Sequence, residues 1–233
     1  MTAGERELAI LAEVLAGNVP SFERTLRSVR ISVPNGLDVR SAHVRVVADY
    51  LAIGVDDDFI RIPMTPRTAQ KIALAAGCVL PTRKIVDEVY RAATVKLTSP
   101  TFAPGDGMTS SGTFELHERA IEERRREVGG RLGDLTAGHK KDIVISARLR
   151  VSPGRLAIYG WFREDGRPIQ PLSTVHDDKY VDYAHGVRLV DRAMLVDGKP
   201  RDVVDVLRDP VLSALLSDEG VVDPAAYAVG PHL

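Results

Sequence analysis

The segment from His176 to Arg188 has the highest density of side chains that can do chemistry. It reads His-Asp-Asp-Lys-Tyr-Val-Asp-Tyr-Ala-His-Gly-Val-Arg and holds two of the six histidines of the chain. If it forms a strand, Tyr180 and Asp182 share a face, because alternate residues of a strand point to the same side. A tyrosine and a carboxylate near His185 can orient an imidazole for general acid–base catalysis. A polar sheet edge with a hydrogen-bonded turn is the structural alternative.

Two further segments carry candidate residues. In Gly138-His139-Lys140-Lys141-Asp142, which directly precedes an apolar run, the turn and Lys141 could hold a carboxylate or a phosphate. A solvated loop explains adjacent lysines equally well. The second segment holds Trp161, the only tryptophan, and Gln170 within Pro168-Ile169-Gln170-Pro171. An aromatic side chain beside this rigid segment could shape a specificity pocket, although core packing also accounts for Trp161.

Together these motifs resemble those of a bacterial protein family to which no activity is attached. The shared motifs are Val79-Leu80-Pro81-Thr82-Arg83-Lys84, Gly138-His139-Lys140-Lys141-Asp142, Tyr159-Gly160-Trp161, Pro168-Ile169-Gln170-Pro171-Leu172 and Tyr180 to Val190. In similar chains the last motif reads Asp-Tyr-Ser-His-Gly, with serine where this chain has Ala184.

The resemblance implies that a serine at position 184 would be a nucleophile, and that Ala184 is either a natural loss or an engineered replacement. On a strand the adjacent His185 would point away from it, so His139 or His176 is the better candidate base. Lys141, Arg188 or the Gly186 amide could donate to an oxyanion.

Several familiar sites are missing from the sequence. There is no Gly-x-Gly-x-x-Gly, no Gly-Lys-Ser/Thr phosphate loop, no Gly-x-Ser-x-Gly and no His-Glu-x-x-His. Cys78 lies between two helix-forming segments, where a reactive thiol is conceivable, but its apolar neighbours favour a small buried side chain. The turn Asp56-Asp57-Asp58 lacks the glycine and the distal glutamate of a calcium loop. His139, His176, His185 and Asp182 have no diagnostic metal-ligand spacing, so we expect no metal and no cofactor.

Length and charge limit the class of protein. A chain of 233 residues with 44% hydrophobic residues can bury one core, and its net charge of -1 argues against a nucleic-acid partner. No apolar run approaches the roughly 20 residues of a membrane span. Without a visible signal peptide, a cytoplasmic location is the default, and a secreted one applies if a leader was removed. The sequence does not indicate an oligomeric state.

Hydrophobic periodicity predicts a mixed α+β fold, with an antiparallel sheet packed against several helices in a single domain over residues 1–233. Helices are expected over 5–15, 65–76, 82–93, 114–128, 203–207 and 211–216. A small antiparallel meander is expected over 27–62, and further strands over 142–146, 155–161, 168–172, 180–183, 187–190 and 194–196. The charged run Glu122-Glu123-Arg124-Arg125-Arg126-Glu127 is interpreted as a solvated helix face with intrahelical ion pairs, and not as a binding patch.

These observations favour a hydrolase that acts on an amide- or ester-like bond in a small molecule or a short polymer. The pocket would form from residues 139–142, 168–172 and 176–188. The expected roles are listed here: His176 or His139 as general base, Asp182 as its orienter, Ala184 and His185 beside them, and Lys141, Gln170, Tyr180 and Arg188 in contact with substrate. One alternative is a non-catalytic protein that binds a carboxylate or a sugar in the same pocket. Another is a metal-dependent enzyme that uses the histidines as ligands.

Overall fold

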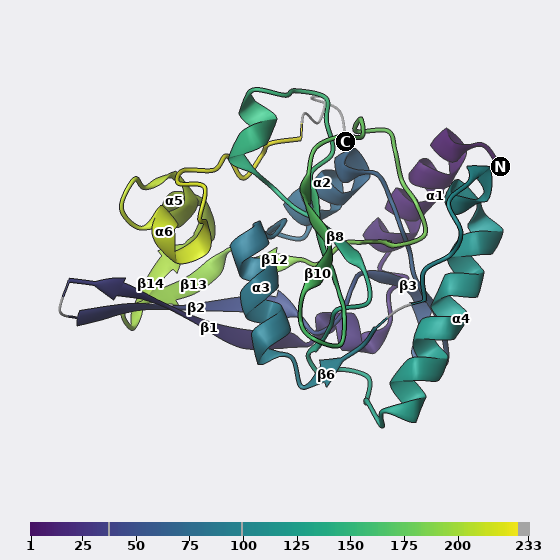
Figure 1. Ribbon diagram of the computed structural model, residues 1–233, viewed down its shortest axis with the longest axis horizontal. Coiled ribbons are helices and arrows are strands. Elements are labelled where there is room, and N and C mark those ends of the chain that lie inside the picture. Colours follow the sequence, from purple (N-terminus) through teal and green to yellow (C-terminus); the bar gives the residue numbers. More distant parts are fainter. Residues whose placement is uncertain (37, 99, 228–233) are drawn as a thin grey trace.

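A six-stranded sheet, a four-stranded sheet and six α-helices make up the described part of the chain in a computed structural model (Figure 1). The structure describes residues 1–36, 38–98 and 100–227. The helices are α1 (Ala3–Leu15), α2 (Pro66–Ala75), α3 (Arg83–Ala92), α4 (Ser111–Glu127), α5 (Val203–Arg208) and α6 (Ser213–Leu216), with single 3-10 turns at η1 (Ser21–Arg24), η2 (Asp106–Thr109) and η3 (Ala147–Arg150). The predicted α+β fold is confirmed.

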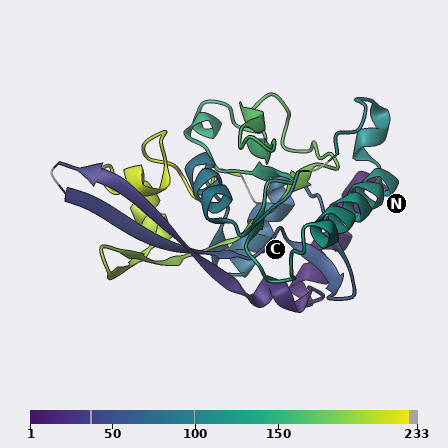
Figure 2. The ribbon, with the colours of Figure 1, turned by 60° about the horizontal axis from the view of Figure 1, so that its bottom comes forward.

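The six-stranded sheet is built around a long hairpin. β1 (Leu26–Asn35) pairs with β2 (Asp38–Val47) along the whole length of both strands, and the hairpin extends away from the rest of the molecule (Figures 1 and 2). The other edge of β2 pairs with β13 (Ala193–Val196) and β12 (Val190–Asp191). β14 (Lys199–Asp202) pairs with β13, and β5 (Cys78–Val79) pairs with β12.

The four-stranded sheet carries most of the candidate residues. Its strand order is β10 (Pro168–Ser173), β9 (Ile158–Phe162), β8 (Lys141–Ile143) and β11 (His185–Gly186). β8 and β11 are parallel, whereas the other two pairs are antiparallel. Two small sheets complete the structure, the hairpin of β3 (Ala52–Val55) and β4 (Asp58–Arg61), and the parallel pair of β6 (Val95–Lys96) and β7 (Thr136–Ala137).

Local sequence explains where the helices begin. Thr2 and Glu5 form a reciprocal capping box at α1. Thr65 caps α2 through its side chain, with Pro66 in the first turn, and Thr82 caps α3 in the same way. These short helices bury one face each, which holds them against the sheets.

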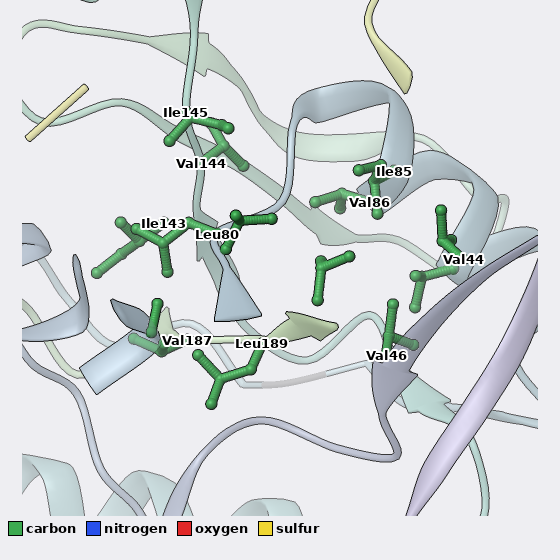
Figure 3. Packing of buried hydrophobic residues seen from close by; sticks show 14 of the residues in the cluster. Val44, Val46, Leu80, Ile85, Val86, Ile143, Val144, Ile145, Val187 and Leu189 are labelled. Atoms are coloured by element: carbon green, nitrogen blue, oxygen red, sulfur yellow. The ribbon is translucent and has the colours of Figure 1, made fainter. Parts of the chain in front are cut away.

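The main core lies between the two sheets and α3, where apolar side chains from distant segments meet (Figure 3). Val44 and Val46 come from β2, Ile85 from α3, and Ile143 from β8, and all four are fully buried. The same hydrophobic cluster includes residues from Ile10 to Tyr227, so both ends of the described chain pack on one core. No helix in the described residues is both long and apolar enough to span a bilayer.

Two details of the predicted strands were wrong. Residues 27–62 do not form one meander, because β3 and β4 make a separate two-stranded sheet. The expected strands over 180–183 and 187–190 shrink to His185–Gly186 and to Val190 with Asp191, and residues 180–184 form an irregular turn. The reason is local: the Asp182 side chain accepts a hydrogen bond from the Ala184 amide (2.9 Å), which competes with a strand ladder.

Candidate functional site

Lys141 is the first residue of β8, and it lies in different surroundings from the adjacent Lys140. Lys141 lies opposite His185 of β11 and opposite Gly160 of β9. Its amide donates to the Ala184 carbonyl (2.6 Å), which ties the 176–188 segment to the middle of the sheet. Lys140 faces the other way and is fully buried. Strand pairing therefore places Lys141, and not Lys140, beside the candidate residues around Asp182.

Five side chains gather around the carboxylate of Asp182. Together with Asp182 we call them the Asp182 cluster: Lys141, Trp161, His176, Tyr180 and His185. Asp182 Oδ2 accepts from Lys141 Nζ (2.9 Å) and from the Tyr180 hydroxyl (3.3 Å), and it lies 3.9 Å from His185 Nε2. The rings of His176 and Tyr180 stack with centroids 3.9 Å apart, and the Tyr180 ring meets the His185 ring edge-on.

Burial divides the cluster into an inner and an outer part. Lys141 is 7% exposed, Asp182 1% and His185 0%, whereas His176 and Tyr180 are half-buried. The outer pair is thus the part of the cluster that solvent contacts. Asp182 and Lys141 form an ion pair in a region of low dielectric, where the attraction between them is stronger than at the surface.

The surroundings set the protonation states of the cluster. Burial lowers the pKa of His185 to about 4, so its imidazole is neutral at pH 7. Burial raises the pKa of Asp182, but His185 and Lys141 more than offset this and hold the pKa below its usual value. Burial and the neighbouring Asp182 raise the pKa of Tyr180 to about 12, so its hydroxyl stays a hydrogen-bond donor. The inner site combines a carboxylate with a neutral imidazole.

The backbone at Trp161 is strained and turns the indole toward Lys141. In a regular strand the residue after Gly160 would point away from the side of Lys141. The φ angles of +108° at Gly160 and +56° at Trp161 break this alternation, and Lys141 Nζ lies 5.1 Å from the centre of the indole ring. A bulky residue at positive φ costs about 1–3 kcal/mol, and such strain concentrates at functional sites.

Several polar groups of the cluster have no hydrogen-bond partner among the described residues. Both ring nitrogens of His185 and Nε1 of Trp161 are buried and unpaired. Lys141 Nζ makes one hydrogen bond, to Asp182, although an ammonium group carries three N–H donors. Buried polar atoms are nearly always paired, so unpaired ones mark a place for a ligand atom or an ordered water.

A second set of buried polar residues lies beside the Asp182 cluster and is centred on Arg61 of β4. We call it the Arg61 network: Asp49, Arg61, His117, Glu118, Glu122, His139 and Lys140. The Arg61 guanidinium contacts Asp49 (2.8 Å), Glu118 (2.5 Å) and Glu122 (2.9 Å). Burial raises the pKa of Asp49, but Arg61 more than offsets it and holds that pKa far below its usual value.

His139 belongs to this network and not to the Asp182 cluster. Its Nε2 lies 3.3 Å from Asp49 Oδ1, outside hydrogen-bond geometry, and its ring packs edge-on against Tyr50. Burial lowers the pKa of His139 to about 4. The three donors of Lys140 are all matched, by the carbonyls of Arg61 and Tyr183 and by Nδ1 of His117. Lys140 therefore has a structural role, in contrast to Lys141.

Arg188, Gln170 and Ala184 occupy three different places. Arg188 is buried; it donates to the carbonyls of Val47 (2.8 Å) and Thr136 (2.6 Å) and stacks over Tyr50, so its donors point into the core. Gln170 is half-buried on β10, in register with Gly160, and its side chain donates to the Pro171 carbonyl.

The methyl group of Ala184 packs in a small apolar cluster with Phe114, Trp161, Val181 and Tyr183. Partly buried residues from β4 and the residue after it, from the 102–108 segment and from β10 cover this cluster: Ile60, Ile62, Phe102, Met108 and Ile169. Position 184 thus adjoins the Trp161 wall of the Asp182 cluster. A serine there would place a hydroxyl in apolar surroundings that also hold the unpaired indole N–H.

Sequence reasoning missed the Arg61 network. Asp49 and Arg61 lie in ordinary-looking segments, and the run Glu122–Glu127 is predicted to be a solvated helix face with intrahelical ion pairs. Those pairs form, between Arg125 and Glu122 and between Arg124 and Glu127. The prediction of a solvated face is wrong for Glu122, which contacts Arg61, and holds for the exposed Arg126 and Glu127. One sequence feature could have indicated that these carboxylates are buried. Glu118 and Glu122 are four residues apart, on the helix face that also carries the apolar Phe114 and Ile121. Cys78, predicted to be a small buried side chain, is only partly buried, and this burial raises the pKa of its thiol to about 11.

No three His, Cys, Asp or Glu side chains gather as a metal-binding group within residues 1–36, 38–98 and 100–227. No family model, curated protein or solved structure matches the chain. The resemblance of its motifs to a bacterial family therefore stays a prediction, and functional inference depends on the geometry of the site.

Proposed function

We propose that the chain is a hydrolase that acts on an amide- or ester-like bond, with the Asp182 cluster as its catalytic centre. The observation that best supports this is the set of buried, unpaired polar groups around one carboxylate–ammonium pair. These groups are the imidazole of His185, the indole N–H of Trp161 and the two remaining N–H bonds of Lys141. Both a base and hydrogen-bond donors are thus available where no protein group uses them.

The reaction assigned to this site uses water as the nucleophile. Neutral His185 accepts a proton from a water molecule as the water oxygen bonds to the substrate carbonyl carbon. Lys141 and Trp161 donate to the oxygen that becomes negatively charged. The protonated His185, stabilised by Asp182, then gives its proton to the leaving amine or alcohol as the carbon–heteroatom bond breaks. His176, Tyr180 and Gln170 contact the rest of the substrate at the half-buried edge.

Water is assigned this role because the Asp182 cluster contains no serine, threonine or cysteine. Ala184 occupies the position where the family resemblance places a serine. If a hydroxyl at that position is the nucleophile, Ala184→Ser should raise the rate of ester hydrolysis by at least tenfold. If the introduced hydroxyl only pairs with the Trp161 indole, the variant should gain thermal stability without a gain in rate.

A carboxylate-binding protein without catalysis is the second candidate. The same donors on Lys141 and Trp161 suit a carboxylate, because a hydrogen bond from an ammonium group to a carboxylate is strong. Saturable stabilisation by a carboxylate, without turnover of any ester or amide, would favour this candidate over the hydrolase.

The test is a panel of nitrophenyl esters and nitroanilides, assayed with the wild-type protein and three variants. We expect His185→Gln and Asp182→Asn to lower kcat/KM at least a hundredfold, while Asp177→Asn, an exposed carboxylate in the same segment, keeps it within twofold. Because the pKa of His185 is about 4, the acid limb of kcat/KM should lie near pH 4 and not near pH 6.5. Equal loss in all three variants, or no loss in any, would rule out this assignment of residues.

A further inference from the structure

The inner part of the Asp182 cluster is closed to solvent. Lys141 is 7% exposed, Asp182 1% and His185 0%. Hydrolysis as proposed above requires a substrate carbonyl within hydrogen-bond reach of Lys141 and a water molecule beside His185, at about 3 Å. A segment of the chain must therefore move before a substrate enters, and this step of the inference rests on the proposed function.

The connection between β10 and β11 lies over the cluster. β10 and β11 are the two outer strands of the four-stranded sheet, so this connection runs from one edge of the sheet to the other. We call its first part, residues 174–180, the strap. Six of its seven residues are exposed or half-buried, whereas every residue from 181 to 190 is buried. The chain thus passes from the surface to the interior between Tyr180 and Val181.

Two rings of the strap form the outer side of the cluster. The Tyr180 hydroxyl donates to Asp182 Oδ2 over 3.3 Å, and its ring lies edge-on to the His185 ring with centroids 5.7 Å apart. The His176 ring stacks on the Tyr180 ring at an interplanar angle of 10°. Tyr180 therefore contacts both the carboxylate and the imidazole, and an outward movement of the strap uncovers them.

The strap is held by contacts at the molecular surface. Asp177 pairs with Arg155 in an isolated antiparallel bridge, which two backbone hydrogen bonds of 3.0 Å flank. Asp178 forms an ion pair with Arg67 (2.7 Å), whose side chain is 49% exposed. Ion pairs with an exposed partner stabilise a structure only weakly. Segments with few buried apolar contacts and solvent-exposed hydrogen bonds open locally far more often than the core unfolds.

We propose that the strap is a lid, which lifts from Asp182 and His185 to admit substrate and then closes over it, with the Tyr180–Val181 junction as its hinge. In the closed state without substrate, the Tyr180 hydroxyl pairs with Asp182. Closure over a bound substrate places its carbonyl in surroundings of low dielectric, where a donor such as Lys141 acts most strongly.

A reversible disulfide between positions 155 and 177 tests the proposal. The flanking hydrogen bonds make Arg155 and Asp177 a non-hydrogen-bonded pair, whose Cα atoms lie about 4.5 Å apart, within the range of a disulfide. The double variant Arg155→Cys/Asp177→Cys is made together with Cys78→Ala, so that the new thiols are the only ones. Opening is followed by the rate at which diethyl pyrocarbonate modifies His185, located by mass spectrometry, with the half-buried His43 as reference. Ester hydrolysis is followed in parallel.

We expect both His185 modification and kcat/KM for esters to fall at least tenfold in the oxidised double variant, and reduction of the disulfide to restore both. Modification of His43 should not change. An unchanged rate of His185 modification, with the disulfide confirmed by mass, would overturn the proposal. If His185 is protected while turnover persists, or if the wild-type protein turns over no substrate, the hydrolase assignment is wrong, and His185 modification alone decides whether the strap is a lid.

Arg67→Gln supplies a second test if the double variant does not fold. Loss of the ion pair with Asp178 weakens one anchor of the strap, so modification of His185 should become about 1.5-fold to fivefold faster. Arg91→Gln removes an exposed arginine that pairs with Glu88 on α3, and it should leave that rate unchanged. Equal rates of His185 modification in the two variants would contradict the proposal.

Discussion

Replacing Arg61 with methionine should be among the most destabilising single substitutions in this chain. Its guanidinium is fully buried and contacts Asp49, Glu118 and Glu122. Its removal leaves Asp49 and Glu118 without their ion-pair partner, whereas Glu122 keeps its ion pair with Arg125. Removing one partner of a buried ion pair costs about 3–5 kcal/mol, and we expect the upper part of that range. For a chain of this size, this corresponds to a fall in Tm of roughly 8–20 °C. Arg126→Met, at an exposed arginine 4.0 Å from Glu122, should cost less than about 0.5 kcal/mol.

Urea unfolding followed by the fluorescence of the single tryptophan measures both variants, and pH supplies an independent check. Without Arg61, burial raises the pKa of Asp49 and Glu118, so the folded variant takes up protons more readily than the unfolded one. The deficit in free energy of unfolding should therefore shrink as the pH falls from 7.5 to 5. In the wild-type protein the contribution of Asp49 persists down to its unfolded pKa of about 3.9 and is lost below it. A deficit under 1 kcal/mol at pH 7.5, or one that grows on acidification, would refute the reasoning.

Two further substitutions probe the core beside the candidate site. Burial raises the pKa of Asp142 to about 7, partly offset by Arg188 and Tyr50, so the folded state holds a proton that the unfolded state has lost. The stability that this group contributes is present at low pH and is lost as the pH rises toward 7. In urea titrations the free energy of unfolding of the wild-type protein, relative to that of Asp142→Asn, should therefore fall by roughly 3 kcal/mol between pH 5 and pH 8. A difference between the two proteins that stays constant over this range would contradict the prediction. Gly186→Ala would place a Cβ 2.6 Å from the Tyr50 ring and 2.7 Å from Lys140 Cβ. We therefore expect the free energy of unfolding, measured by urea denaturation, to fall by about 1–3 kcal/mol. A fall of less than about 0.5 kcal/mol would show that Tyr50 and Lys140 move easily to accommodate the methyl group.

Most of the fold prediction came from the periodicity of hydrophobic residues and from helix-capping residues. The helices that begin at Thr65 and Thr82 were predictable because a capping side chain and an apolar stripe indicate the same structure. The 180–184 segment was not, because its alternating pattern suggests a strand while the Asp182 side chain closes a turn on the Ala184 amide. Tyr180 and Asp182 do meet, as predicted, but through that turn and not through a shared strand face.

The candidate site was predictable only where its residues are close in sequence or joined by one strand pairing. Asp182 and His185 lie in one motif, and the parallel pairing of β11 with β8 brings Lys141 to them. The sequence alone did not indicate that His139 and Lys141 belong to different sites. In the structure His139 lies next to Asp49, in the Arg61 network. The conformation of Trp161 was equally hidden, because a positive φ at a bulky residue depends on tertiary packing.

The most direct test of the central proposal is the rate of ester and anilide hydrolysis by the wild-type protein and by Asp182→Asn, with Asp177→Asn as the matched control. If the Asp182 cluster is a hydrolytic centre, the wild-type protein and the Asp177 variant turn over at least one substrate class at similar rates, and Asp182→Asn is at least a hundredfold slower while still folded by circular dichroism. No turnover of any substrate by the wild-type protein and by Ala184→Ser, or a rate that does not change in folded Asp182→Asn, would contradict the proposal.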